Sequence, residues 1–222
     1  MAKIAAAELS GWKICANGIT IGESRGGNEM KVTCLNGSPR ENGNSTLIAK
    51  RFCDTAINLV AEVKTFALNK LDYRGCQGCY ACKTKFDRCV LKDDLSEVLE
   101  AVRETDILVL ASPVYFWDVT AQMKGFLDRC FSFLVPDFHT NPKRSRLAPG
   151  KKLVFILTQN NLDQNSFTHI FEKFDYFFRG FGFTDTRQIR AFGAREPGAV
   201  ASDPELMGLA AKTAEELCPG SH

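Results

Sequence analysis

The 222-residue sequence lacks three features that would point to common function classes. No apolar run approaches the roughly 20 residues that a membrane-spanning helix requires, so we expect no membrane segment. The formal net charge is only +2. A nucleic-acid-binding protein more often has a basic face, so we expect no nucleic-acid partner. The three histidines, His139, His169 and His222, show no metal-ligand spacing, and we assign them no role.

Cysteine, by contrast, is plentiful, with nine residues in the chain. The first residues, "MAKIAAAELSGWK", have Glu8 inside their only apolar stretch and make a poor secretory signal. We therefore expect a cytoplasmic protein, in which thiols normally stay reduced. Because an odd number of cysteines cannot all pair, disulfides are the weakest explanation of this abundance.

Strand-like and helix-like segments alternate from residue 30 onward. Short apolar runs predict five strands, at 30–36, 61–68, 106–112, 151–159 and 186–193. Apolar residues at helical spacing predict five helices, at 45–60, 93–104, 119–134, 166–181 and 203–217. Asp93 or Asp94 is expected to cap the second helix. The alternation predicts an α/β fold with a parallel sheet covered on both faces.

Residues 1–29 stand apart from this pattern as an N-terminal extension of the expected domain, 30–218. Within them, "KICANGITIG" (13–22) places Asn17 and Gly18 between two strand-like runs, which favours a small β-hairpin appendage. An alternative is that Met30 is the natural start, because codons for "SRGGNEM" can include a ribosome-binding sequence.

The segment "NGSPRENGNST" (36–46) connects the first predicted strand to the first predicted helix. In open α/β sheets, ligands bind beyond the carboxyl ends of the strands. Gly37 and Gly43 allow a ligand to approach the backbone closely, and the helix start offers free N–H groups to a phosphate. Neither GxGxxG nor GxxxxGK[ST] is present, which argues against dinucleotide and nucleoside-triphosphate sites. A phosphate cradle and an ordinary Ser/Asn-capped helix both remain open.

Two more loops follow strands that are expected to end at the same edge. "SPVYFWDVT" (112–120) places three aromatic residues in a row, which a flat ligand such as isoalloxazine would cover. Alternatively, these aromatic residues pack under the long loop 135–150 or in a dimer interface. "TQNNLDQ" (158–164) is rich in amides that could bond the edge of a flavin ring.

Four cysteines fall within fifteen residues, in "GCQGCYACKTKFDRC" (75–89), with the spacing C-x2-C-x2-C-x6-C. The first three repeat the spacing by which bacterial ferredoxins hold three irons of one cubane. A structural zinc site would more often use two separate CxxC pairs. On the residues alone, a cluster, zinc or redox thiols, and a loop without an inorganic cofactor all remain open.

Three motifs, "NGSPRENGNST", "GCQGCYACKTKFDRCVLKDD" and "SPVYFWDVTAQMKGFLDR", together resemble the NADPH-dependent FMN reductase branch of the flavodoxin-like proteins. Within it, the iron–sulfur flavoproteins are the most similar group. The resemblance covers about residues 30–190. It implies a flavodoxin-like doubly wound sheet of five parallel strands, with a cysteine-rich loop (73–92) inserted after the second strand and FMN bound non-covalently at the carboxyl edge.

The resemblance also implies which residues hold the cofactors. For the FMN phosphate they are Ser38, Arg40, Asn44, Ser45 and Thr46. For the isoalloxazine they are Pro113, Val114, Tyr115, Phe116 and Trp117, with a weaker match at Thr158 and Gln159. For a [4Fe–4S] cluster they are Cys76, Cys79, Cys82 and Cys89.

We therefore expect an FMN-containing oxidoreductase that relays electrons between FMN and a [4Fe–4S] cluster. The expected redox partner is NAD(P)H or a protein such as ferredoxin, and the expected assembly is a homodimer or homotetramer. We nominate no catalytic acid or base, because flavin and cluster would carry the electrons. The alternatives are an NAD(P)H-dependent FMN or quinone reductase without a cluster, and a non-enzymatic flavodoxin-like electron carrier.

Overall fold

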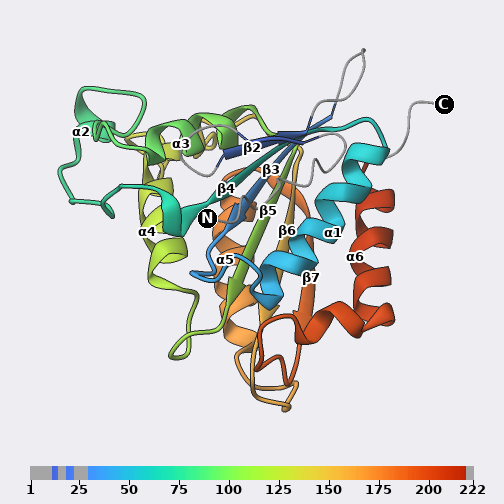
Figure 1. Cartoon of the computed structure of the whole chain (residues 1–222). Coiled ribbons are helices and arrows are strands. Elements are labelled where there is room, and N and C mark those ends of the chain that lie inside the picture. Colours follow the sequence, from blue (N-terminus) through green and yellow to red (C-terminus); the bar gives the residue numbers. More distant parts are fainter. Residues whose placement is uncertain (1–11, 15–18, 23–29, 219–222) are drawn as a thin grey trace, which may run out of the picture.

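Five parallel strands form most of one sheet in the computed structural model, which describes residues 12–14, 19–22 and 30–218 (Figure 1). They are β3 (Lys31–Asn36), β4 (Glu62–Ala67), β5 (Ile107–Pro113), β6 (Lys151–Thr158) and β7 (Phe183–Ala191). Their order is β4-β3-β5-β6-β7, and each neighbouring pair is parallel. This is the flavodoxin-like strand order, so the predicted fold class is confirmed.

Two short strands extend the sheet beyond β4. The strands β1 (Trp12–Ile14) and β2 (Ile19–Gly22) pair in antiparallel fashion, and β2 also pairs antiparallel with β4. The expected appendage therefore adds to the sheet itself. The predicted turn at Asn17 and Gly18 lies outside the described residues.

Helices cover both faces of the sheet (Figure 1). On one face lie α1 (Asn44–Asn58) and α6 (Pro204–Leu217). On the other lie α3 (Leu95–Glu104), α4 (Ala121–Arg129) and α5 (Thr168–Gly180). Short helical segments occur in the loops: η2 (Leu68–Lys70), α2 (Ala81–Thr84), η3 (Cys130–Phe133) and η4 (Ala199–Ser202).

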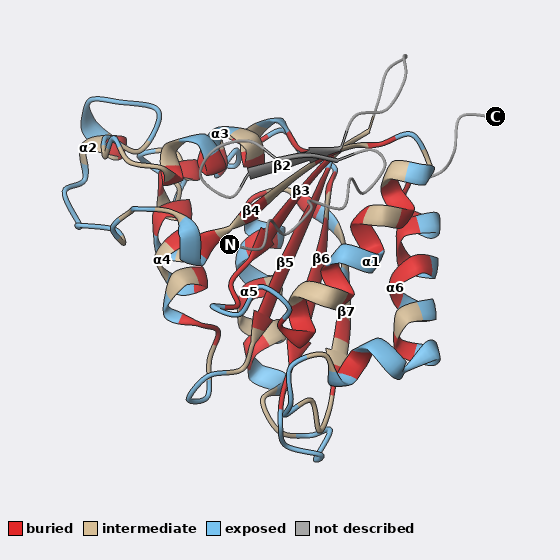
Figure 2. Cartoon of the chain, in the orientation of Figure 1, coloured by how far each residue is buried: buried red, intermediate tan, exposed pale blue. Residues whose placement is uncertain are grey.

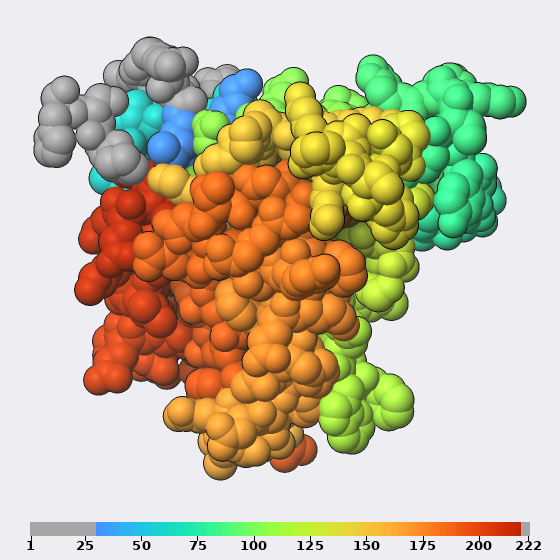
Figure 3. Space-filling view, turned by 180° about the vertical axis from the view of Figure 1, so that it is seen from behind, coloured from blue at the N-terminus to red at the C-terminus, as the bar shows by residue number. Residues whose placement is uncertain are grey.

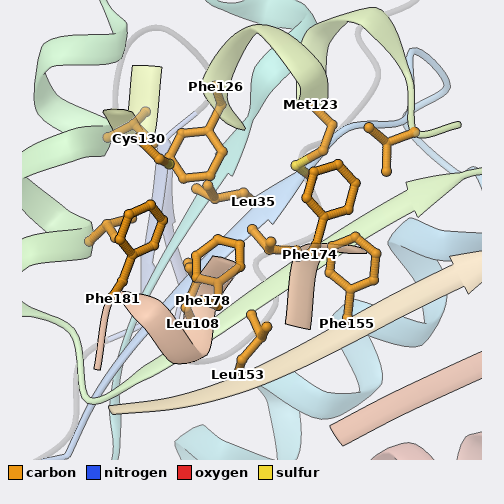
Figure 4. Close-up of a cluster of buried hydrophobic side chains, with 14 of the residues drawn as sticks. Leu35, Leu108, Met123, Phe126, Cys130, Leu153, Phe155, Phe174, Phe178 and Phe181 are labelled. Carbon is orange, nitrogen blue, oxygen red and sulfur yellow. The ribbon is translucent and has the colours of Figure 1, made fainter. Parts of the chain in front are cut away.

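The sheet separates two apolar clusters, because successive side chains of a strand point to opposite faces. Along β5, Leu108 and Leu110 belong to the cluster under α3, α4 and α5, whereas Ile107 and Val109 belong to the cluster under α1 and α6. Figure 2 shows the strands buried along most of their length, and Figure 4 shows Phe126 and Phe178 facing Leu35 and Leu108 in the first cluster. Each fully buried side chain of this size contributes about 1.5–3 kcal/mol.

The prediction that Asp93 or Asp94 caps α3 is right about the position of the cap and wrong about a capping hydrogen bond. Asp94 occupies the N-cap position, but within the described residues its side chain bonds no N–H of the helix. Its carboxylate instead accepts a hydrogen bond of 2.8 Å from the backbone N–H of Asp72. Asp93 pairs with Arg129 on α4. Both carboxylates are used by contacts between distant segments, so the helix start has no local cap.

The predicted helix 119–134 is shorter than its apolar pattern indicates. The α-helix ends at Arg129, and the chain continues as the 3₁₀ segment η3. In the part of the chain that the structure describes, no helix is long and apolar enough to cross a membrane.

Candidate functional site

Three loops meet at the carboxyl edge of the sheet, at the bottom of Figure 1. They follow β3, β5 and β6, which are neighbours in the sheet and parallel to one another. After β3 the chain turns to one side of the sheet, to β4, and the later strands add on the other side. Ligands of open α/β sheets bind at such a switch point. The predicted meeting of the three loops is confirmed.

The loop after β3 packs tightly against the start of α4. The backbone N–H of Gly37 donates to Ala111 O at 2.8 Å, and the Thr120 hydroxyl donates to Gly37 O at 2.7 Å. A Cβ atom on Gly37 would lie 2.9 Å from Thr120 Oγ1 and 3.0 Å from Met123 Cβ. One on Gly43 would overlap the Ser38 hydroxyl. Both glycines are therefore required by close packing within the loop.

The start of α1 offers hydrogen-bond donors that have no partner among the described residues. Its N-cap is Gly43, and no side chain in that part of the chain caps it. The Ser45 and Thr46 hydroxyls are buried without a described partner. The first backbone N–H groups of an α-helix also have no intrahelical acceptor. The alternative of an ordinary Ser/Asn-capped helix is therefore wrong. Donors without a described partner, at the positive end of a helix, fit a phosphate.

The two other polar residues expected at the phosphate are arranged differently. The Asn44 side chain is hydrogen-bonded at both ends: Nδ2 donates to Ala194 O at 3.1 Å and to Glu196 O at 2.9 Å, and Oδ1 accepts from Val200 N at 3.4 Å. Asn44 therefore fastens the loop before α6 and offers a ligand only its backbone N–H. Arg40 is exposed, and its side chain is free to reach an anion.

The aromatic residues after β5 form a tight two-residue turn. Tyr115 and Asp118 exchange two backbone hydrogen bonds, of 2.8 and 3.1 Å. Between them, Phe116 and Trp117 have φ angles of 42° and 67°, which non-glycine residues rarely adopt. Phe116 is 94% exposed and Trp117 64% exposed. The alternative that these rings pack under the loop 135–150 is therefore wrong. Backbone strain and exposed apolar surface together are typical of a ligand site.

Helix α5 fixes this turn from the side. Lys173 Nζ forms an ion pair of 2.7 Å with Asp118 Oδ2, and His169 Nε2 lies 3.2 Å from Trp117 O. The Trp117 ring also meets Phe167 edge-on, at 6.1 Å between centroids. Sequence reasoning missed Lys173, and it assigned His169 nothing. No local pattern could reveal these contacts, because they join segments about fifty residues apart.

The third loop is held by its own amides. Thr158 O accepts from Val114 N at 2.8 Å, which joins the ends of β5 and β6. Gln159 Nε2 donates to Asn161 O and Asp163 O, both at 3.0 Å, and Gln159 Oε1 accepts from Arg190. The Gln159 side chain therefore shapes the loop. Its backbone remains at the edge where the other two loops lie.

The four cysteines of the 73–92 loop line a single cavity. Cys82 is buried, Cys89 is half-buried, and Cys76 and Cys79 are exposed. Gly78 and Tyr80, which lie between the first three thiols, have positive φ angles of 62° and 56°, as residues in tight turns often do. The predicted convergence of the four cysteines is therefore present in the fold.

The thiols do not form a compact site for one ion. Among the described residues, no group of three or more Cys, His, Asp or Glu side chains could hold a single metal ion. This weighs against the zinc alternative, since structural zinc needs four ligands around one centre. A cubane binds each thiolate through a different iron, so its four cysteines line a wider space. The four cysteines line one cavity, as a cluster held by four thiolates would require.

Two cations anchor this loop to the body of the domain. Lys83 Nζ donates to Phe131 O at 2.6 Å and to Leu134 O at 2.9 Å, and lies 3.5 Å from Cys82 Sγ. Burial lowers the pKa of the Lys83 ammonium. Arg146 donates to Cys82 O at 2.9 Å and to Ser132 O at 2.8 Å. In Figure 3 the loop that carries Arg146 (yellow) lies directly beside the cysteine loop (teal).

The two candidate sites lie at opposite ends of α4. Thr120, its N-cap, contacts the loop after β3, whereas Ser132, just beyond its C-terminal end, lines the cysteine cavity. From Thr120 to Ser132, a helical rise of about 1.5 Å per residue corresponds to about 18 Å. Figures 1 and 3 agree that the cysteine loop projects away from the edge where the three loops meet.

Comparisons with known proteins match this arrangement. Residues 30–161 match the family model described as NADPH-dependent FMN reductase. An iron–sulfur flavoprotein of Methanocaldococcus jannaschii is 37% identical over 100 residues, which cover 45% of this chain and 51% of that protein. An iron–sulfur flavoprotein of Archaeoglobus fulgidus is 38% identical over 104 residues, which cover 47% of each. The matches thus span about half the length of these curated relatives.

The fold has close counterparts among solved structures. An NAD(P)H:quinone oxidoreductase from Methanothermobacter marburgensis superposes with a TM-score of 0.67 at 18% identity, covering 87% of this chain and all of that one (100%). At this level of identity the similarity shows a shared flavodoxin-like architecture.

Proposed function

The chain belongs to the NADPH-dependent FMN reductase family, and on this ground we propose that it is an oxidoreductase that binds FMN at the carboxyl edge of its sheet. One observation carries the proposal. The Ser45 and Thr46 hydroxyls at the start of α1 have no partner among the described residues, and the Trp117 ring is exposed. The loops that lead to these two places are joined by the bond from Thr120 to Gly37. Free donors and an aromatic surface at one edge support FMN, which combines a phosphate with a flat aromatic ring.

The chain's own groups divide between these two parts. For the phosphate we propose the hydroxyls of Ser38, Ser45 and Thr46, the guanidinium of Arg40 and the backbone N–H of Asn44. For the isoalloxazine we propose Pro113, Val114, Tyr115, Phe116 and Trp117, with the backbone at Thr158 and Gln159. When bound, FMN supplies hydride or single-electron transfer, and the protein positions the ring and excludes water from it.

For the second cofactor we propose a [4Fe–4S] cluster held by Cys76, Cys79, Cys82 and Cys89. The single cavity that these thiols line supports this assignment, as do the iron–sulfur flavoproteins among the curated relatives. A cluster supplies one-electron exchange, so the proposed function is an electron relay between FMN and the cluster. The reductant or acceptor would be NAD(P)H or a ferredoxin-like protein, in the cytoplasm.

The arrangement along α4 favours a relay within an oligomer. About 18 Å of helix separates the two sites of one chain, and electron transfer slows steeply with distance. We therefore propose a homodimer or homotetramer in which the cysteine cavity of one chain lies near the FMN edge of another. The exposed Phe116 and Trp117 rings would be covered in such an assembly.

Anaerobic purification tests the proposal directly. We expect a flavin absorption band that NADPH bleaches, together with about four iron and four acid-labile sulfide per chain. Cys79→Ser should remove the iron and retain the flavin. Flavin without iron would leave an NAD(P)H-dependent FMN or quinone reductase, and a colourless protein that takes up no FMN would refute the function.

A further inference from the structure

Two residues in the wall of the cysteine cavity each have a buried polar atom without a hydrogen-bond partner in the described part of the chain. These atoms are Arg129 Nε and Ser132 Oγ, and both residues line the cavity together with the four cysteines. Buried polar atoms are nearly always paired, because leaving one unpaired forfeits its hydration without replacement. A group bound in this cavity would supply the missing acceptor.

Of the three guanidinium nitrogens of Arg129, only Nε has no hydrogen-bond partner in the described part of the chain. Its side chain is 0% exposed. Nη1 donates to both carboxylate oxygens of Asp93, at 2.6 and 2.8 Å, and to Arg74 O at 3.1 Å, while Nη2 lies 3.5 Å from Leu91 O. These contacts fix the plane of the guanidinium. The Nε–H is therefore a donor in a fixed position, and it belongs to a guanidinium that is always positively charged.

Ser132 supplies a second donor from the neighbouring turn. Its residue is buried in η3, and its backbone oxygen already accepts from Arg146. The Ser132 hydroxyl has no hydrogen-bond partner among the residues that the structure describes. By contrast, Lys83, a half-buried cation on the cysteine loop, has its ammonium committed to Phe131 O, Leu134 O and Cys82 Sγ.

We propose that Arg129 Nε–H and Ser132 Oγ–H are positioning groups that donate hydrogen bonds to sulfur atoms of the cluster held by Cys76, Cys79, Cys82 and Cys89. This inference rests on the proposed cluster. Hydrogen bonds to cluster sulfur stabilise the reduced, more negative state and raise the reduction potential. The two residues thus tune the potential without ligating iron.

The test compares the cluster potentials of Arg129→Lys and Ser132→Ala with that of the wild type. Arg129→Lys keeps the positive charge and removes the planar Nε–H, and Ser132→Ala removes only a hydroxyl. For Arg129→Lys we expect a potential about 59 mV more negative, the one-electron equivalent of a tenfold change. Ser132→Ala should shift it in the same direction. Lys85→Gln, which removes an exposed charge of the same loop, should shift it less, because water screens that charge.

Iron and sulfide analysis of each protein separates the possible failures. A wild type without iron and sulfide would refute the proposed cluster and this inference with it. Variants that keep the wild-type iron and the wild-type potential would overturn the inference and leave the cluster standing. Should Arg129→Lys fail to fold, Ser132→Ala still decides, since it leaves the Asp93 pair and the backbone contacts intact. Loss of iron from folded Ser132→Ala protein would support the assignment, because that variant alters no cysteine.

Discussion

The Thr120 hydroxyl donates a hydrogen bond of 2.7 Å to the backbone oxygen of Gly37. This bond joins the loop after β3 to the start of α4 and brings the proposed phosphate and ring parts of the FMN site together. No side chain fits at position 37 beside this bond, since a Cβ there would lie 2.9 Å from Thr120 Oγ1. The geometry of the site therefore depends on having a glycine at this position.

Gly37→Ala should weaken both folding and FMN binding. The added methyl group would press against Thr120 and Met123, and overpacking of this kind lowers the free energy of unfolding by about 1–3 kcal/mol. Urea unfolding and FMN titration would measure the two effects. Gly208→Ala in α6 is the matched control, because a Cβ there meets nothing within 4 Å. It should raise stability by up to about 1 kcal/mol, and an equal loss in both variants would contradict the packing argument.

Phe116→Gly should separate stability from binding. Phe116 is exposed and has a positive φ, a conformation that costs a non-glycine residue about 1–3 kcal/mol. Glycine relieves that strain, so the unfolding free energy should stay constant or rise, while FMN affinity falls because the ring surface is lost. A variant that binds FMN as tightly as the wild type would show that this turn does not contact the flavin.

Asp93→Asn should be strongly destabilising. Arg129 is fully buried, and removing its carboxylate partner leaves an uncompensated charge, at a cost of about 3–5 kcal/mol. The exposed pair of Lys50 and Asp54 provides the comparison, because Asp54→Asn should cost no more than about 1 kcal/mol. Chemical denaturation of both variants measures the difference. Similar losses would mean that Arg129 reaches water.

Tyr73 should lower the free energy of unfolding at alkaline pH. Burial raises the pKa of Tyr73 to about 12, from 10.0 for the free side chain, and its hydroxyl donates to Gln122 O at 2.5 Å. Because the folded state holds this proton more tightly, its contribution is complete below pH 10 and is lost as the pH rises from 10 to 12. Tyr73→Phe should flatten the slope of unfolding free energy against pH in that window. Tyr176→Phe, at an exposed position, should retain the wild-type slope.

Much of the fold was predictable because its signals are local. Strands buried on both faces appear as continuous apolar runs, which is why β5 and β6 were found within a residue or two of their ends. The carboxyl edge followed from the alternation of strands and helices. The four cysteines that line one cavity were also identified together, since their spacing in the sequence is short.

The rest depended on contacts between segments far apart in the chain. Asp93 looked like a helix cap but pairs with Arg129, 36 residues away. Asn44 looked like a phosphate ligand, but its amide bonds a carbonyl 150 residues later. Gln159 is held by Arg190 in the same manner. A polar side chain near a site has several possible partners, and only the tertiary structure shows which one it meets.

The most direct test of the account is to titrate the flavin-free protein with FMN and with riboflavin, which lacks the phosphate, in parallel. If the start of α1 holds the phosphate, FMN should bind at least about 100-fold more tightly, since charge-assisted hydrogen bonds contribute about 1.5–3 kcal/mol each. Ser45→Ala combined with Thr46→Val should remove much of that preference and leave riboflavin binding unchanged. Equal affinity for the two flavins, or no binding of either by the folded protein, would contradict the central claim.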